Sequence, residues 1–115
     1  METMLASTVL FKNAAGEEEL IITCEPTGTG GLIVRQESAG DVTFWSFEES
    51  PHVVETCIDA TGIRRLCAHF GADTVDQVSH MLAMNFTGYD AALCVRKLLR
   101  ELGIGYDVIE NPIAR

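Results

Sequence analysis

The chain has 115 residues, of which 47% are hydrophobic, and this is enough to bury the core of one domain without disulfide bonds or a metal. Its net charge of −9 at pH 7 makes direct binding to nucleic acid or to an anionic membrane surface unfavourable. No apolar run approaches the roughly 18 to 20 residues of a membrane-spanning helix, and Glu2 stands where a signal peptide would carry a basic residue, so we expect a cytoplasmic protein.

The first half of the chain has the pattern of short strands separated by turns. We expect a β-meander over residues 5–47, with strands at Ser7–Lys12, Leu20–Cys24, Leu32–Gln36 and Val42–Phe47. The glycine-rich segment Gly28–Gly31 precedes a strand and not a helix, so its backbone N–H groups have no helix N-terminus behind them. We therefore interpret it as a hairpin turn and not as a phosphate-binding loop.

The second half has helical spacing, and we expect a helical layer over residues 51–102. Ser50 and Pro51 suit the start of a helix over Pro51–Ile58, and a second helix is expected over Thr61–Phe70, ending at Gly71. Asp73 or Thr74 would cap a third helix, since Thr74 with Gln77 fits a capping box.

A last helix is expected from near Thr87 to Leu102, with its basic residues Arg96, Lys97 and Arg100 on the outer face. A strand over residues 104–110 would then return to the sheet. The pattern predicts a single α+β domain over residues 1–115. Its sheet is mostly antiparallel, a four-strand N-terminal meander plus the C-terminal strand, and three to four helices pack on one face.

The negative charge is confined to one half of the chain. Up to Asp59 there are eleven acidic residues against Lys12 and Arg35, whereas from Ala60 onward six acidic and six basic residues cancel. A one-sided anionic field of this kind steers basic partners toward a protein. We therefore expect an acidic protein-binding module with a basic protein as its partner.

The segment Asp41–Ile58 holds the only Trp of the chain and four acidic residues. Trp45 and Phe47 would point to the face of the fourth strand opposite Phe44, so they either belong to the core or form an exposed aromatic patch. The candidate partner-binding residues are the acids and aromatics of the predicted sheet half: Glu17, Glu18, Glu19, Asp41, Trp45, Phe47, Glu48, Glu49 and Glu55.

No catalytic, cofactor-binding or metal-binding motif is present, so we expect a protein that is not an enzyme and carries no cofactor or metal. The cysteines are expected to be reduced and mostly buried: Cys24, Cys57, Cys67 and Cys94. The histidines are expected in three separate helices: His52, His69 and His80. A Cys–His arrangement, of Cys57 or Cys67 with a histidine and Asp59 or Asp73, is left open by the sequence.

In size, in its acidic sheet half and in the aromatic strand Val42–Phe47 (VTFWSF), the chain resembles the small immunity proteins of bacterial contact-dependent toxin systems. The resemblance implies a cognate toxin domain, often a basic nuclease, whose active site is occluded by carboxylates that imitate phosphates. Acidic residues would steer and pair with the toxin, and Trp45 or Phe47 would anchor it. Two alternatives remain: a homodimeric structural or regulatory module that pairs through the aromatic strand, and a small enzyme or ligand-binding domain.

Overall fold

The computed structural model describes residues 7–15, 18–39 and 52–112, which form one sheet and a layer of helices. The strands in these ranges are β1 (Thr8–Ala15), β2 (Glu18–Pro26), β3 (Leu32–Ala39), β4 (His52–Ile58) and β5 (Asp107–Pro112). The helices lie between β4 and β5 in sequence and are α2 (Ala60–Phe70), α3 (Val75–Asn85) and α4 (Ala91–Leu102). Not one of these helices has the length and apolar character needed to cross a membrane.

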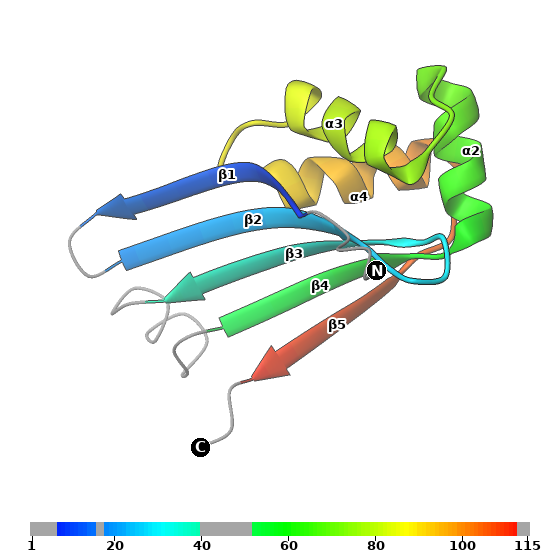
Figure 1. Cartoon of the computed structure of the whole chain (residues 1–115). Helices are drawn as coiled ribbons and strands as arrows, with labels where there is room; N and C mark the ends of the chain where they lie inside the picture. Colours follow the sequence, from blue (N-terminus) through cyan, green and yellow to red (C-terminus); the bar gives the residue numbers. More distant parts are fainter. Residues whose placement is uncertain (1–6, 16–17, 40–51, 113–115) are drawn as a thin grey trace, which may run out of the picture.

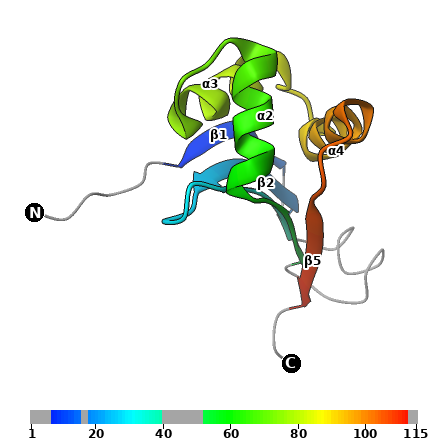
Figure 2. The same cartoon turned by 90° about the vertical axis from the view of Figure 1, so that its right-hand side faces the viewer.

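The sheet is antiparallel throughout, with the strands in the order β1-β2-β3-β4-β5 (Figure 1). The first four strands follow one another as a meander, and β5 joins at β4 after the three helices. The helices lie together over one face of the sheet, as two perpendicular views show (Figures 1 and 2). The predicted α+β fold, a four-strand meander with a returning C-terminal strand and helices on one face, is confirmed.

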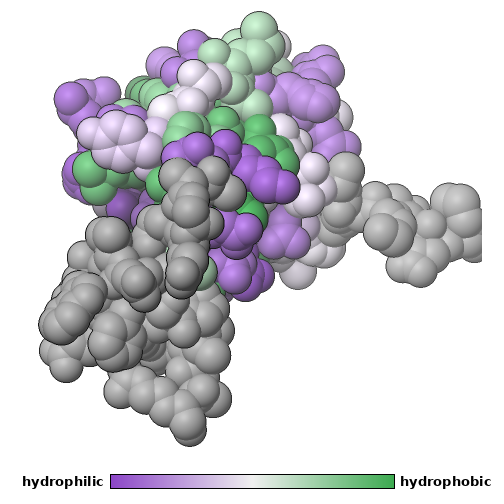
Figure 3. Space-filling view, turned by 90° about the vertical axis from the view of Figure 1, so that its left-hand side faces the viewer, coloured by the Kyte–Doolittle hydropathy of each residue, from purple (hydrophilic) through white to green (hydrophobic). Residues whose placement is uncertain are grey.

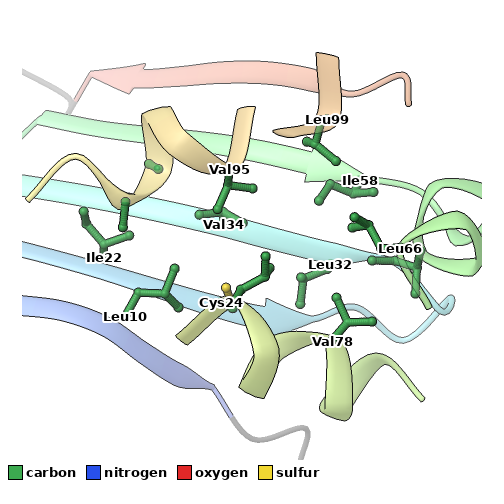
Figure 4. Packing of buried hydrophobic residues seen from close by; sticks show 14 of the residues in the cluster. Leu10, Ile22, Cys24, Leu32, Val34, Ile58, Leu66, Val78, Val95 and Leu99 are labelled. Atoms are coloured by element: carbon green, nitrogen blue, oxygen red, sulfur yellow. The ribbon is translucent and has the colours of Figure 1, made fainter. Parts of the chain in front are cut away.

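The core fills the space between this helix-covered face and the helices (Figure 4). Because side chains alternate along a strand, every second residue of the sheet points toward the helices. Each fully buried aliphatic side chain stabilises the fold by about 1.5–3 kcal/mol relative to its exposed state. The largest side chains of the core with no exposed surface are Ile22, Leu32, Val34, Leu66, Val78, Leu82, Val95 and Leu99.

The helix predicted over Pro51–Ile58 is wrong, because residues His52–Ile58 form strand β4. The segment is rich in β-branched residues, which favour strands: Val53, Val54, Thr56 and Ile58. Its backbone is paired on both sides, with β3 and with β5. The helical layer therefore begins at Ala60, and the strand predicted over Val42–Phe47 lies outside the described residues.

The later helix boundaries follow the predicted capping signals. The helix α2 ends at Gly71, whose φ of 69° is the left-handed conformation that glycine adopts most easily. The Oγ1 of Thr74 accepts a hydrogen bond from the N–H of Gln77 at the start of α3. The helix α4 begins at Ala91, later than predicted. Its Arg96 is not on the outer face, because its guanidinium donates to Thr56 Oγ1 at 2.9 Å.

Candidate functional site

The face of the sheet opposite the helices carries two of the predicted binding residues, Glu19 and Glu55. Within the described ranges, no helix lies over this face. The register of the strands places Thr23, Arg35, Glu55 and Ile109 side by side across its middle. The neighbouring rows are Ile21, Glu37 and Val53 on one side and Glu25, Ile33, Cys57 and Asp107 on the other. We call these three rows the open face.

Carboxylates and apolar side chains alternate over the open face. Glu25 and Asp107 are exposed, and Arg35, a base within the rows, lies opposite Glu55 and 3.7 Å from the carboxylate of Glu37. The apolar Ile109 remains 44% exposed, although Val53 is buried. A surface of this composition can desolvate apolar contacts while it pairs charges with a basic partner.

The structure places only some of the predicted partner-binding residues. Glu19 is exposed and, by alternation, projects on the same side as the open face, and Glu55 lies within that face. Glu18 is the first residue of β2. The remaining predicted residues lie outside the described residues: Glu17, Asp41, Trp45, Phe47, Glu48 and Glu49. The sequence interpretation missed Glu25, Glu37 and Asp107, because their common face follows from strand pairing and not from a local motif.

A hollow of about 390 Å³ lies where β4 passes into α2, beside the start of β5. Two of its charged groups, Asp59 and Arg65, already have structural partners. The carboxylate of Asp59 accepts the N–H of Gly62 at 2.8 Å and caps α2, and Arg65 donates to the carbonyl groups of Leu102 and Gly103. The hollow therefore lies at a structural junction, where Arg65 of α2 holds the segment that leads from α4 into β5.

The thiol of Cys57 lines this hollow, but its surroundings favour the protonated form. Partial burial and the nearby carboxylates of Glu55 and Asp107 raise the pKa of Cys57 above its ordinary value. A nucleophilic thiol needs the opposite environment, one that stabilises the thiolate. The geometry thus gives no support to nucleophilic chemistry at Cys57.

The other cysteines are free, and burial raises the pKa of two of them, Cys94 and Cys24, the latter to about 12. Cys67 donates its thiol to the carbonyl of Thr74 at 3.9 Å, and His69 packs edge-on against Phe70. Among the described residues, no group of three or more His, Cys, Asp and Glu side chains is arranged to hold a metal ion.

A buried histidine pairs with β5, and the sequence interpretation missed it. His52 lies in β4 and not in a helix as predicted, its side chain is 5% exposed, and its Nε2 is 3.0 Å from the carboxylate of Glu110. The two residues are 58 positions apart. Only the pairing of β4 with β5 brings them together, so no local sequence signal could have indicated the contact.

The segment Gly28–Gly31 forms a hairpin turn between β2 and β3, as predicted. The N–H of Thr27 donates to the carbonyl of Gly31, and the N–H of Gly31 donates to Thr27 Oγ1, each at 3.0 Å. Gly30 has a φ of 89°, which favours glycine. The turn is closed by its own hydrogen bonds, and its N–H groups do not converge on an anion site.

A second exposed apolar group lies on the helical layer. Met84, Tyr89 and Leu93 are 75%, 73% and 58% exposed around the connection between α3 and α4. Figure 3 views this end of the molecule and shows apolar residues beside polar ones on the surface. Residues 60–102 hold five basic and four acidic residues, so the helical layer lacks the negative bias of the sheet half.

Comparisons with known proteins gave no match among protein-family models, curated proteins or solved structures.

Proposed function

We propose that this chain is an acidic, cytoplasmic binding protein that neutralises a basic toxin domain by covering its active site, as the immunity proteins it resembles do. A nuclease is the kind of toxin that fits best, because its active site must attract phosphate and therefore also attracts carboxylates. The mechanism is steric and electrostatic, and it requires no covalent step.

The observation that carries this proposal is the open face of the sheet. Its exposed carboxylates at Glu25 and Asp107 lie at the two ends of one row of the sheet, and the apolar Ile109, 44% exposed, lies in the next row. Apolar contacts supply affinity once water is excluded, whereas charges mainly raise the association rate and select the partner. Both components of a protein interface are thus present on one face.

Affinity capture with the tagged chain tests the proposal in two stages. The chain is first exposed to a lysate of its source cells at low and at high salt, and retained proteins are identified by mass spectrometry. Each retained basic protein is then assayed for nuclease or other toxic activity with increasing amounts of the chain. We expect one basic protein to be retained and its activity to be abolished near equimolar chain.

The double variant Glu19→Gln/Glu25→Gln should weaken this capture, because both carboxylates are exposed on the open side of the sheet. The matched control is Asp73→Asn/Glu101→Gln, which removes the same charge from exposed positions of the helical half. Equal loss in both variants, or a retained protein whose activity the chain does not inhibit, would contradict the proposal.

Two variants test the residues outside the described ranges. Neutralising Glu48 and Glu49 should slow association and flatten its dependence on salt. Trp45→Ala should speed dissociation while the fold is retained. Unchanged association in low salt would remove the two glutamates from the steering surface, and unfolding of Trp45→Ala would assign this side chain to the core.

A further inference from the structure

The two edges of the sheet differ in how they are protected. Edge β1 has a bulge between Val9 and Phe11 and an exposed Lys12, and both features hinder the addition of another strand. Edge β5 pairs with β4 over six consecutive residues without a register shift, and among the described residues no second strand pairs with it. Over residues 107–111, before Pro112, which has no N–H, edge β5 therefore offers a regular row of backbone groups to an incoming strand.

From Asp107 to Glu110, the side chains of β5 are exposed on both faces of the sheet. Val108 and Ile109 are 47% and 44% exposed, and they project to opposite sides because they are adjacent in a strand. An added strand would cover both of them, in addition to pairing with the backbone. The acidic residues Asp107 and Glu110 flank this apolar pair and are also exposed.

The carboxylates of Asp107 and Glu110 make edge β5 more favourable for some incoming strands than for others. In antiparallel pairing of the β5 edges of two copies, directly opposite residues project to the same face, so Val108 lies opposite Val108 or Ile109 lies opposite Ile109. Asp107 then lies opposite Ile109 or Asn111, so neither register gives this carboxylate a partner of opposite charge. A strand with Lys or Arg at these two positions forms favourable pairs instead.

We infer that edge β5 binds an extended basic segment of the partner by strand addition. The segment has the pattern basic, apolar, apolar, basic, so that its charged residues lie opposite Glu110 and Asp107 and its apolar residues lie opposite Ile109 and Val108. This inference rests on the proposed function and specifies how the partner is held.

Synthetic peptides test the inference on the intact chain. The probe is the hexapeptide Thr-Lys-Val-Ile-Lys-Thr, and its control is Thr-Lys-Pro-Ile-Lys-Thr, which has the same charge but lacks one backbone donor and resists strand pairing. Binding is followed by NMR titration of the labelled protein up to millimolar peptide, together with amide hydrogen exchange. We expect the first peptide alone to slow exchange in β5, while exchange in β1 is unchanged.

A pair of charge-reversal variants gives the matched control on the protein side. Asp107→Lys should weaken binding of the probe by roughly threefold to tenfold, because one favourable cross-strand pair is replaced by repulsion. Asp73→Lys alters the net charge equally at an exposed site just before α3 and should leave binding unchanged. Circular dichroism of both variants confirms that each one is folded.

Several outcomes would overturn the inference. These are equal binding of the two peptides, shifts centred on a surface other than β5, no binding at millimolar probe, and a dimer of the free chain with β5 amides already protected. The proposed function is tested separately by capture and inhibition. A toxin inhibited equally by the wild-type chain and by Asp107→Lys would refute strand addition while the proposed function stands.

Discussion

Replacing Gly62 by Ala should destabilise the protein, although the same change in an exposed helix usually stabilises it. Gly62 is the third residue of α2 and is buried. An added Cβ would lie 2.7 Å from Cγ2 of Ile58 and 2.9 Å from Cγ2 of Ile104, whereas ordinary van der Waals contact begins at 3.4 Å. Ile58 and Ile104 are 2% and 5% exposed, so neither methyl group can move into solvent.

The two opposing contributions set the size of the effect. Alanine is favoured over glycine inside a helix by about 1 kcal/mol. Overpacking of a well-filled core costs about 1–3 kcal/mol, and here two buried methyl groups must move by several tenths of an ångström. Because two buried contacts are violated at once, the overpacking cost should lie in the upper half of its range, about 2–3 kcal/mol, and we expect a net loss of about 1–2 kcal/mol in the free energy of unfolding.

Urea denaturation followed by circular dichroism measures this loss. The matched control is Gly28→Ala, because a Cβ at this exposed turn position meets no atom within 4 Å. We expect the control to change stability by less than about 0.5 kcal/mol. An unchanged or higher urea midpoint for Gly62→Ala would refute the argument. If the Ile104 contact is the strained one, amide exchange in β5 should also accelerate, since Ile104 lies just before that strand.

Three further changes probe the cap, the core thiol and the contact between α4 and the sheet. Thr74→Ala removes the side-chain cap of α3 and should cost about 1 kcal/mol, seen as a melting temperature lower by about 4 °C, whereas Thr74→Ser should retain it. The pKa of Cys24, raised by burial to about 12, lies above its value of 9.0 in the unfolded chain. Stability from this thiol is therefore complete below pH 9 and is lost as pH rises toward 12, and urea midpoints of Cys24→Ala should decline less over that range. Thr56→Val removes the acceptor of the half-buried Arg96 and should cost about 1 kcal/mol, which Arg96→Met in the same background should partly restore.

The parts of the fold that depend on local chemistry could be predicted from the sequence. The glycines at positions 71 and 103 end α2 and α4 in the left-handed conformation, and Thr74 caps α3. Each of these boundaries rests on a hydrogen bond or a backbone preference that acts within a few residues. Such signals act whatever the tertiary contacts are, so the sequence alone predicts the helices after Ala60.

Strand β4 could not be predicted in the same way. The buried residues of this strand are His52, Val53, Thr56 and Ile58, a spacing that neither strict alternation nor a helical period produces. His52, Thr56 and Ile58 project toward the helices and Val53 projects to the opposite face, while β3 and β5 pair with the backbone from either side. The strands that pair with β4 are distant in sequence, so the local spacing of apolar residues alone predicts a helix there. The open face and the His52–Glu110 contact were missed for the same reason.

The acidic charge of the sheet half has two physical effects, since it opposes self-association and attracts a basic partner. A meander covered on one side leaves an open face and one regular edge, and both surfaces invite association with further copies of the same chain. Coulomb repulsion between identical charges opposes that association, while the same charges attract a basic partner.

Removing a carboxylate from the edge should therefore weaken partner binding and raise self-association together. Sedimentation of Asp107→Asn should show a concentration-dependent dimer that is absent from Asp73→Asn. If Asp107→Asn stays monomeric at the same concentrations, the carboxylate is not what keeps edge β5 unpaired.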